Sequence, residues 1–430
     1  LDRSSAASDV YKRQGMVDTL MLSSVNDQAV GAVGTANTYI GIFIIMFSVI
    51  SSGMVAVMTQ NIGAGRPGVA YQARQLGLAF NAVLGIIMSL FLSLGAGTIL
   101  SGVGVADALM QPAKTYLQIV GGFCILNALI PICSSYLRAF GFSKEPLYAS
   151  IIGNVINFCL NAFFLFVLHK GVAGVATATV ISRIINLVIV VLLGAVLVKA
   201  KQHPERESNR AVMGQIIRIG LPSACETAIY NVSMTLVIRF LNQMDAQGLN
   251  VTARSYTMQI TNFSYCVGAA LAQANAIMTG WHIGAKEYDA CDRGTRKAAI
   301  IGVIVAVILE TMFALCSGWI MQLFSKDPQM VSLVGKLLAI DIVLEMGRVT
   351  NLVYGQALKT SGDAVFPVVM GACFMILCSV GGTYLFGIRL GLLAVGAYIG
   401  MAGDECVRAV GMYLRWKSGK WKEKGLVKSR

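Results

Sequence analysis

Long runs of apolar residues, separated by short polar segments, cover most of the chain. A helix that crosses a bilayer needs about 20 mostly apolar residues, and eleven stretches meet that requirement. Backbone groups in lipid must be hydrogen-bonded within the segment, so these stretches predict helices and not strands. The stretches lie at roughly 35–60, 77–100, 115–136, 147–168, 172–197, 215–238, 255–279, 297–322, 333–357, 366–387 and 390–414.

The second half of the chain repeats the first half at one fixed spacing. Ile-Gly-Ala at 62–64 returns at 283–285, and Pro146 returns as Pro367, so both features recur at the same offset. A constant offset indicates a duplication, which is common among secondary transporters. We therefore expect an all-α polytopic membrane protein with two homologous six-helix lobes. It would have twelve transmembrane helices, of which the first is incomplete.

The same offset predicts the domain limits. Residues 1–14 are too polar to span a bilayer, although the repeat places the start of a helix there, so we expect a non-native or disordered segment. An authentic short re-entrant helix is the alternative. We expect an N-lobe at 15–198, a cytosolic linker at 199–211, a C-lobe at 212–414 and a basic tail at 415–430.

Basic residues are concentrated in alternate loops. The loops at 62–76, 137–146, 198–218, 283–298 and 358–366, with the tail, hold 21 Lys and Arg, and the intervening loops hold 7. This bias places the first set and the C-terminus in the cytosol of a multi-pass bacterial inner (plasma) membrane protein. A loop distribution of this kind argues against nucleic acid as a partner. The tail, with Trp416 and Trp421, predicts an anchor at the lipid bilayer surface, or alternatively a plain basic tail.

Composition argues against an enzyme. The ten cysteines include no CxxC pair, so they indicate neither a disulfide framework nor a metal site. The three histidines lie at helix ends or in loops, which leaves histidine catalysis inside the membrane unsupported. The chain contains no phosphate-binding G-x-x-x-x-G-K-[ST] loop of an ATP-driven pump.

Several short motifs occur in order at the predicted helix ends. They are Val-Asp-Thr at 17–19, Gln-Asn-Ile-Gly-Ala at 60–64, Leu-Arg-Ala-Phe-Gly at 137–141, Gly-Leu-Pro at 220–222 and Leu-Lys-Thr-Ser-Gly-Asp at 358–363. In this order they resemble a bacterial branch of the multidrug and toxic compound extrusion (MATE) efflux transporters, with helix 1 truncated. The resemblance implies a V-shaped pair of lobes around a cleft. It also implies no cofactor beyond a coupling ion, Na⁺ or H⁺.

The same resemblance assigns Asp18 to an ion-coupling site in the N-lobe. Its partners would be Asn157 and Asn161 of helix 5 and Thr179 of helix 6. Some family members carry an aspartate where this chain has Asn161, so one carboxylate stands here in place of two. A helix-packing hydrogen bond is the alternative role of Asp18.

A second candidate site lies on helix 10. Asp341, Glu345 and Arg348 share one helix face at spacings of four and three residues. Glu345 and Arg348 can pair, which leaves Asp341 as surplus charge for ion coupling. In helix 12, Asp404, Glu405 and Arg408 are expected to form structural charge pairs, and Arg348 could be shared with them.

Two further carboxylates are candidates for ion coupling. Glu226 lies one turn beyond Pro222 of helix 7. Glu310 lies in the middle of helix 9, as a proton site or as a partner of Arg183 in helix 6. Charged groups at membrane depth are costly and for that reason are frequently functional.

Aromatic and amide side chains of the C-lobe are candidates for a substrate cavity, because tyrosine rings attract organic cations. Packing is the alternative role for each. The candidates are Tyr230, Asn231, Gln259, Asn262, Tyr265 and Tyr354.

Taken together, these features predict a monomeric secondary active transporter. It would export small drugs or organic cations, mainly cationic or amphipathic, in exchange for Na⁺ or H⁺ by alternating access. The alternative is a flippase or exporter of a lipid-linked saccharide or an endogenous metabolite on a related two-lobe fold. Few arginines lie at membrane depth to bind a pyrophosphate, which favours the exporter.

Overall fold

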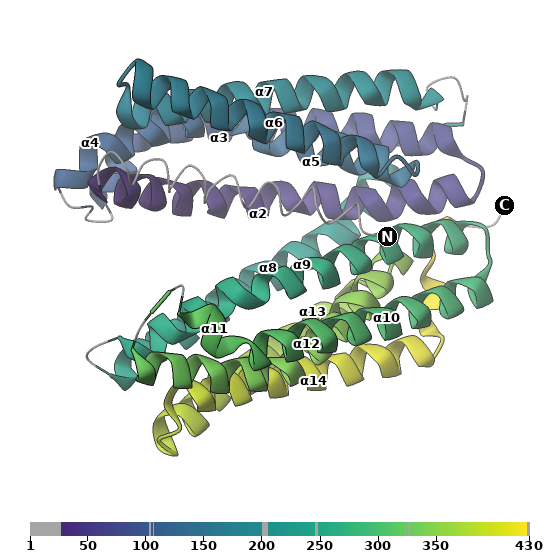
Figure 1. Cartoon of the computed structure of the whole chain (residues 1–430). Coiled ribbons are helices and arrows are strands. Elements are labelled where there is room, and N and C mark those ends of the chain that lie inside the picture. The colour runs from purple at the N-terminus through teal and green to yellow at the C-terminus, as the bar shows by residue number, and fades with distance from the viewer. Residues whose placement is uncertain are drawn as a thin grey trace. The chain divides into compact units, whose positions relative to one another are not determined.

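The computed structural model describes residues 27–102, 105, 107–199, 205–245, 248–322, 324–325 and 327–427. Within these ranges the regular structure is helical, and they contain no β-strand. Figure 1 shows the helices lying roughly side by side within each of two units. The described residues up to Leu221 form the N-terminal unit, and those from Pro222 form the C-terminal unit.

The N-terminal unit is built from long helices and two short π-helical segments. Its elements are α2 (Asp27–Gly63), α3 (Pro67–Gly102), α4 (Asp107–Tyr116), η1 (Leu117–Gly121), α5 (Ile125–Ala139), α6 (Lys144–Ala162), η2 (Phe163–Val167) and α7 (Gly171–Leu197). Helix α8 (Asn209–Met244) crosses the boundary between the units at Pro222.

The C-terminal unit repeats this plan. Its elements after α8 are α9 (Leu249–Gly284), α10 (Tyr288–Leu315), α11 (Ser317–Met321), α12 (Pro328–Ser361), α13 (Val365–Phe374), η4 (Met375–Val380), η5 (Thr383–Arg389), α14 (Leu393–Lys417) and η6 (Lys420–Lys424).

The offset that relates Pro146 to Pro367 in the sequence is also the offset between the helices. It relates the first residues of α3, α4 and α6 to the first residues of α10, α12 and α13, in that order. It also relates the C-terminal end of α2 to that of α9. The prediction of two homologous bundles is therefore confirmed.

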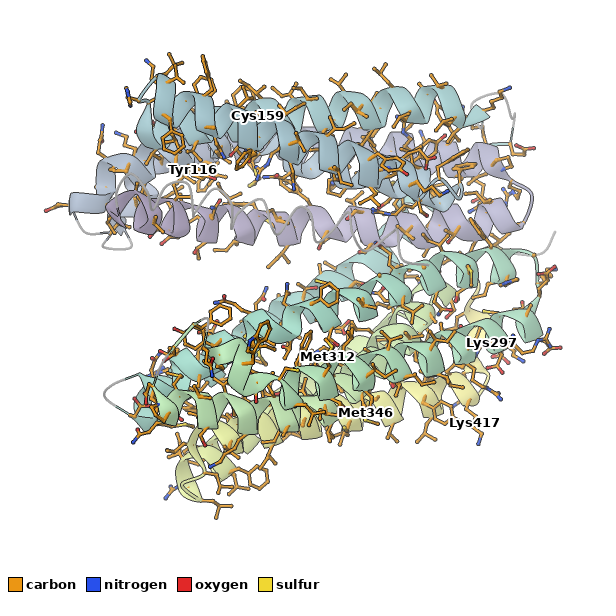
Figure 2. The ribbon with its side chains drawn as sticks, in the orientation of Figure 1. Tyr116, Cys159, Lys297, Met312, Met346 and Lys417 are labelled. Atoms are coloured by element: carbon orange, nitrogen blue, oxygen red, sulfur yellow. The ribbon has the colours of Figure 1, made fainter. Side chains whose placement is uncertain are left out.

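The helices have the length and apolar surface that a bilayer requires. Among the described residues, six helices are long and apolar enough to cross a membrane, or seven if α4, η1 and α5 form one bent span. Outward-facing residues such as Leu94 and Leu315 are more than four-fifths exposed, as expected for lipid-contacting positions. Figure 2 shows Lys297 and Lys417 at one end of the C-terminal unit, with Met312 and Met346 along its middle.

The predicted span at 115–136 is not one continuous helix. It begins earlier, at Asp107, and bends by 43° between Gly121 and Ile125. The amide of Ile125, freed by the bend, donates to Ser89 Oγ at 3.0 Å. A side chain on a neighbouring helix thus stabilises a break that the apolar pattern does not show.

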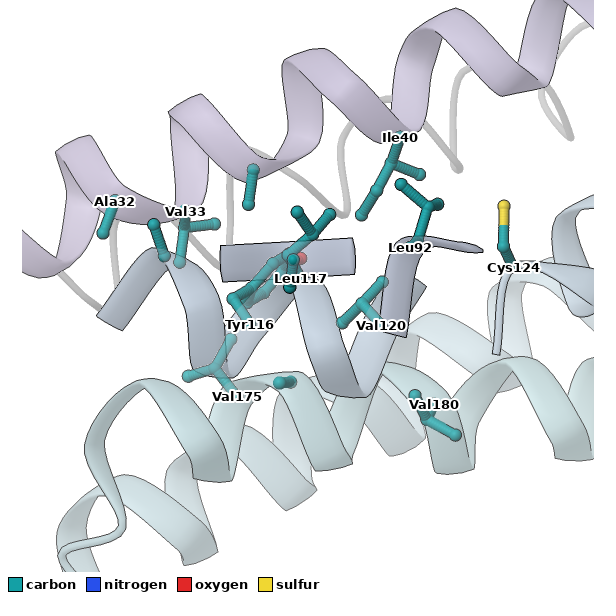
Figure 3. Packing of buried hydrophobic residues seen from close by; sticks show 14 of the residues in the cluster. Ala32, Val33, Ile40, Leu92, Tyr116, Leu117, Val120, Cys124, Val175 and Val180 are labelled. Carbon is teal, nitrogen blue, oxygen red and sulfur yellow. The ribbon is translucent and has the colours of Figure 1, made fainter. Parts of the chain in front are cut away.

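The core of the N-terminal unit lies where α2, α3, α4 and α7 face η1. Figure 3 shows Leu117 and Val120 of η1 packed between Ile40 and Val33 of α2 and Val175 of α7. Beyond this cluster, the buried Asn81 of α3 donates to the carbonyl of Ala128 at 3.0 Å. Apolar side-chain contacts and a hydrogen bond between uncharged groups therefore hold the core of this unit together.

Candidate functional site

The predicted charged face of α12 is buried in the C-terminal unit. Asp341 and Glu345 have almost no exposed surface, and α12 packs against α9, α10 and α14. Arg348 Nη1 pairs with Glu345 Oε2 at 2.8 Å, which is the contact that their spacing predicts. Arg348 Nε also lies 3.5 Å from Glu405 Oε1, and its guanidinium lies 5.7 Å from the ring centre of Tyr265.

A second guanidinium is held more tightly on α14. Arg408 Nε and Nη2 each lie 2.9 Å from an oxygen of Asp404, and Nη2 lies 2.9 Å from Glu405 Oε1. Ser379 Oγ donates to Asp404 Oδ2 at 2.9 Å. Glu405 Oε1 is therefore shared by Arg408 and Arg348, which links α14 to α12.

Glu310 of α10 joins this group from a third helix. Its exposed fraction is 0%, and within the described part of the chain neither carboxylate oxygen has a hydrogen-bond partner. Ser264 of α9 lies beside it, and Ser264 Oγ also lacks a partner of good geometry. Asp341 and Glu345 are its negatively charged neighbours, and Arg348 is the positively charged one.

We call these side chains the acidic network. It contains five carboxylates and two guanidinium groups, so its formal charge is −3 when every group is ionised. One further cation, Arg254 of α9, lies near Tyr398 at the edge of the network and forms no ion pair with a described carboxylate. The members of the acidic network are Glu310, Asp341, Glu345, Arg348, Asp404, Glu405 and Arg408.

Three polar residues that contact carboxylates of the acidic network were not predicted from the sequence. Asn351 Nδ2 donates to Glu405 Oε2 at 3.0 Å, and its position three residues after Arg348 could have revealed it. Ser264 and Ser379 carry no comparable signal, because their partners lie on other helices.

Glu226, a further candidate for ion coupling, forms an ion pair in the C-terminal unit. Lys359, at the end of α12, places Nζ 2.5 Å from Glu226 Oε2, and both side chains are largely buried. This ion pair neutralises Glu226 within the C-terminal unit. The assignment of Glu226 to ion coupling stays a prediction, and an exchange at this carboxylate would break its ion pair with Lys359.

The predicted N-lobe site is described only in part. Asn157 and Asn161 share a buried face of α6, where Asn161 Nδ2 lies 3.3 Å from Asn157 Oδ1. Thr179 of α7 is also buried, and its hydroxyl donates to the carbonyl of Val175 at 2.9 Å. Asp18, the predicted carboxylate of this site, lies outside the described residues.

The cavity candidates fall into two groups. Asn231, Gln259 and Asn262 are exposed on the C-terminal unit, and Tyr230 and Tyr265 lie close to Arg348. Tyr354 is buried instead, and its ring packs edge-on against Tyr413 at 5.6 Å between ring centres. These contacts agree with packing as the alternative role of Tyr354, and its assignment to a substrate cavity stays a prediction.

The basic tail is folded onto the C-terminal unit. Trp421 is 1% exposed and its ring stacks on that of Trp416, with centres 4.1 Å apart. Trp416 Nε1 donates to Asp292 Oδ1 of α10 at 2.8 Å. The predicted bilayer anchor is therefore wrong for both tryptophans, because buried indoles cannot enter a lipid interface.

Asp363, in the loop between α12 and α13, fastens this tail. It accepts from Arg415 Nε at 2.7 Å and from Lys424 Nζ at 2.8 Å. Burial alone would raise the pKa of Asp363, but these hydrogen bonds and charges lower it below its usual value. Gly362, with φ +100°, lies against the carbonyl of Lys424, where a side chain would not fit.

Comparison with known proteins identifies the family. The MatE family profile matches residues 13–163 and 222–385, most of both repeats. An uncharacterized transporter, YisQ of Bacillus subtilis, is 33% identical over 424 residues, which is 97% of this chain and 93% of YisQ. The probable multidrug resistance protein NorM of Thermotoga maritima is 22% identical, over 96% of this chain and 90% of NorM.

Solved structures share the fold over nearly the whole chain. A crystal structure of MATE in the bent conformation superposes with a TM-score of 0.89 and 18% identity, covering 98% of this chain and 94% of the other. An outward-facing multidrug resistance MATE transporter of the MOP superfamily gives 0.86 at 17% identity, covering 99% and 95%. The matched profile and the relative that aligns over nearly the whole chain show that this chain belongs to the MATE family of multi-pass membrane transporters, and the shared fold agrees with this.

Proposed function

We propose that this protein exports small organic cations or amphipathic compounds in exchange for protons, and that the acidic network of the C-terminal unit carries the coupling. The observation that supports this most directly is the surplus of buried carboxylates. An ionised side chain at mid-bilayer costs about 2.5–3.5 kcal/mol. The surplus is therefore retained only if protons or other cations neutralise it for part of the transport cycle.

Glu310 favours the proton over Na⁺ as the coupling ion. A Na⁺ site needs several oxygen atoms that converge on one point, whereas a proton needs one carboxylate oxygen. Glu310 is fully buried and has no ion-pair partner among the described residues, with the Ser264 hydroxyl beside it, which suits a carboxylic acid that gains and loses a proton.

The cargo follows from the same charges. A cation that enters the acidic network would displace protons, and this exchange would link its exit to proton entry. Tyr230 and Tyr265 beside Arg348 add aromatic faces that favour organic cations. The name of the NorM relative, a probable multidrug resistance protein, agrees with a cargo of this class. We place the protein in a bacterial plasma membrane as a monomer with a cytosolic C-terminus.

Ethidium efflux from proteoliposomes tests this proposal. A pH gradient alone should drive efflux, and Glu310→Gln or Asp341→Asn should slow it by about an order of magnitude because the exchangeable charge is lost. Asp289→Asn is the matched control, since Asp289 is an exposed carboxylate on the same helix as Glu310. Efflux driven by a Na⁺ gradient at equal pH, or unchanged in both variants, would contradict the proposal.

A further inference from the structure

The two guanidinium groups of the acidic network are held in different ways. Arg408 is 3% exposed and makes three contacts of 2.9 Å with carboxylates of its own helix. Arg348 is 20% exposed, with one contact of 2.8 Å and a second of 3.5 Å on another helix. The side chain of Arg408 is thus fixed by its contacts. The side chain of Arg348 is more exposed, and a movement of its guanidinium would break fewer contacts.

Unengaged carboxylate oxygens lie around Arg348. Glu345 Oε1 and Asp341 Oδ2 are buried without hydrogen-bond partners in the described part of the chain, and so are both oxygens of Glu310. Asp341 and Glu310 are close enough to interact electrostatically with Arg348. Its guanidinium therefore has more than one carboxylate available to it.

The remaining groups that face this position are few. Helix α8 contributes Tyr230, α9 contributes Tyr265, and α14 contributes Glu405, which Arg408 already shares. Tyr398 of α14 is close enough to interact electrostatically with Asp341, Arg254 and Arg348. Among the described residues, Arg348 is thus the one cation of the network with several unengaged carboxylate oxygens as neighbours.

We propose that Arg348 is a tethered cation that takes the place of one exchangeable proton in the acidic network. This inference rests on the proposed function. When the guanidinium pairs with Glu345, that carboxylate stays ionised and needs no proton. When a change of conformation moves the guanidinium to another carboxylate, Glu345 takes up a proton and the new partner releases one, so the total charge and the number of bound protons are unchanged. Because Arg348 always neutralises one carboxylate, the acidic network binds one proton fewer than its carboxylates alone would need.

Two variants should change the proton count in opposite directions. In Arg348→Gln, Glu345 loses its cation, so one further protonated carboxyl should appear. In Glu345→Gln, the freed guanidinium should pair with Asp341 or Glu310, so one protonated carboxyl should disappear. Arg348→Lys keeps the charge and should leave the count as in the unmodified protein. The carbonyl-stretch infrared band of protonated carboxyls, measured on purified protein in lipid, reports this count directly.

A role of Arg348 in packing alone would leave that band unchanged in all three variants, and this result would overturn the inference. A band gained in Arg348→Gln that persists in Arg348→Gln/Glu345→Gln would also overturn it, because Glu345 would not be the carboxyl concerned. Proton-driven ethidium efflux by the unmodified protein separates the two proposals. If that efflux is present and the band does not respond, the proposed function stands and the tethered cation fails.

Discussion

Asp363 is a loop carboxylate that connects three segments of the C-terminal unit. It joins the loop after α12 to Arg415 of α14 and to Lys424 of the tail. The tail in turn carries Trp421, whose ring stacks on that of Trp416. A single buried side chain therefore holds the ends of two helices and the following segment together.

We expect Asp363→Asn to release the tail and to lower the free energy of unfolding by about 1.5–3 kcal/mol, the contribution of hydrogen bonds to charged groups. A lower melting temperature in detergent and a red-shifted tryptophan emission, as Trp421 meets solvent, would report this. Lys420→Ala is the control, because Lys420 is exposed. Unchanged emission in Asp363→Asn would show that the tail docks without this carboxylate.

The same group gives the docked tail a pH dependence. The folded protein lowers the pKa of Asp363, so its stabilisation is complete above the unfolded-state pKa of about 4 and is lost as pH falls through the lower folded-state value. We expect the unmodified protein to expose Trp421 on acidification below that range. Asp363→Asn should show no such acid transition in tryptophan emission.

At the scale of elements, the acidic network depends on the close approach of α12 and α14. A Cβ on Gly347 would lie 2.8 Å from the backbone nitrogen of Cys406 and from the carbonyl carbon of Glu405. Backbone atoms cannot move aside as side chains do. Gly347 therefore sets the helix separation at which Glu405 reaches Arg348.

We expect Gly347→Ala to push α12 from α14, with a cost of about 1–3 kcal/mol for overpacking, and to uncouple efflux from the pH gradient. Melting temperature and ethidium efflux would be measured together. Gly355→Ala on the same helix is the control, since its nearest atom would be 3.9 Å away, and alanine there should be neutral or stabilising. Equal behaviour of the two variants would argue against this account of α12 packing.

At the scale of the whole molecule, the two repeats share a fold but carry different side chains at equivalent positions. The constant offset between the repeats places Ser89, Cys124 and Asn127 of the N-terminal unit where Glu310, Glu345 and Arg348 stand in the C-terminal unit. The two units thus share a plan of helices, whereas the acidic network belongs to the second alone among the described residues.

The orientation in the membrane is testable on the same scale. The bias of Lys and Arg places the loop before α6 in the cytosol and the end of α3 outside. A membrane-impermeant maleimide should label Ser101→Cys in intact cells and Lys144→Cys only in inverted vesicles. Both side chains are exposed, and the unsubstituted protein controls for its own cysteines. The reverse pattern would invert the topology.

The sequence by itself determined the helices, the duplication and the two parts of the acidic network that each lie within one helix, at 341–348 and at 404–408. Lipid admits only segments that satisfy their own backbone groups, so apolar runs and the repeat at a constant offset sufficed for the fold. The pairing of Glu345 with Arg348 followed from their spacing, because residues three and four apart share a helix face. Each helix and each pair within a helix depends only on residues that are close together in the sequence.

Only the tertiary structure decided which helices meet. It brought Glu310 of α10 to Asp341 of α12, gave Glu226 a partner in Lys359, and buried Trp421 of the tail against Trp416 of α14. Each of these contacts joins side chains from different elements. Their distances depend on how far each helix is rotated and how closely it crosses its neighbour. Those quantities arise from packing at positions such as Gly347, and no spacing along one helix encodes them.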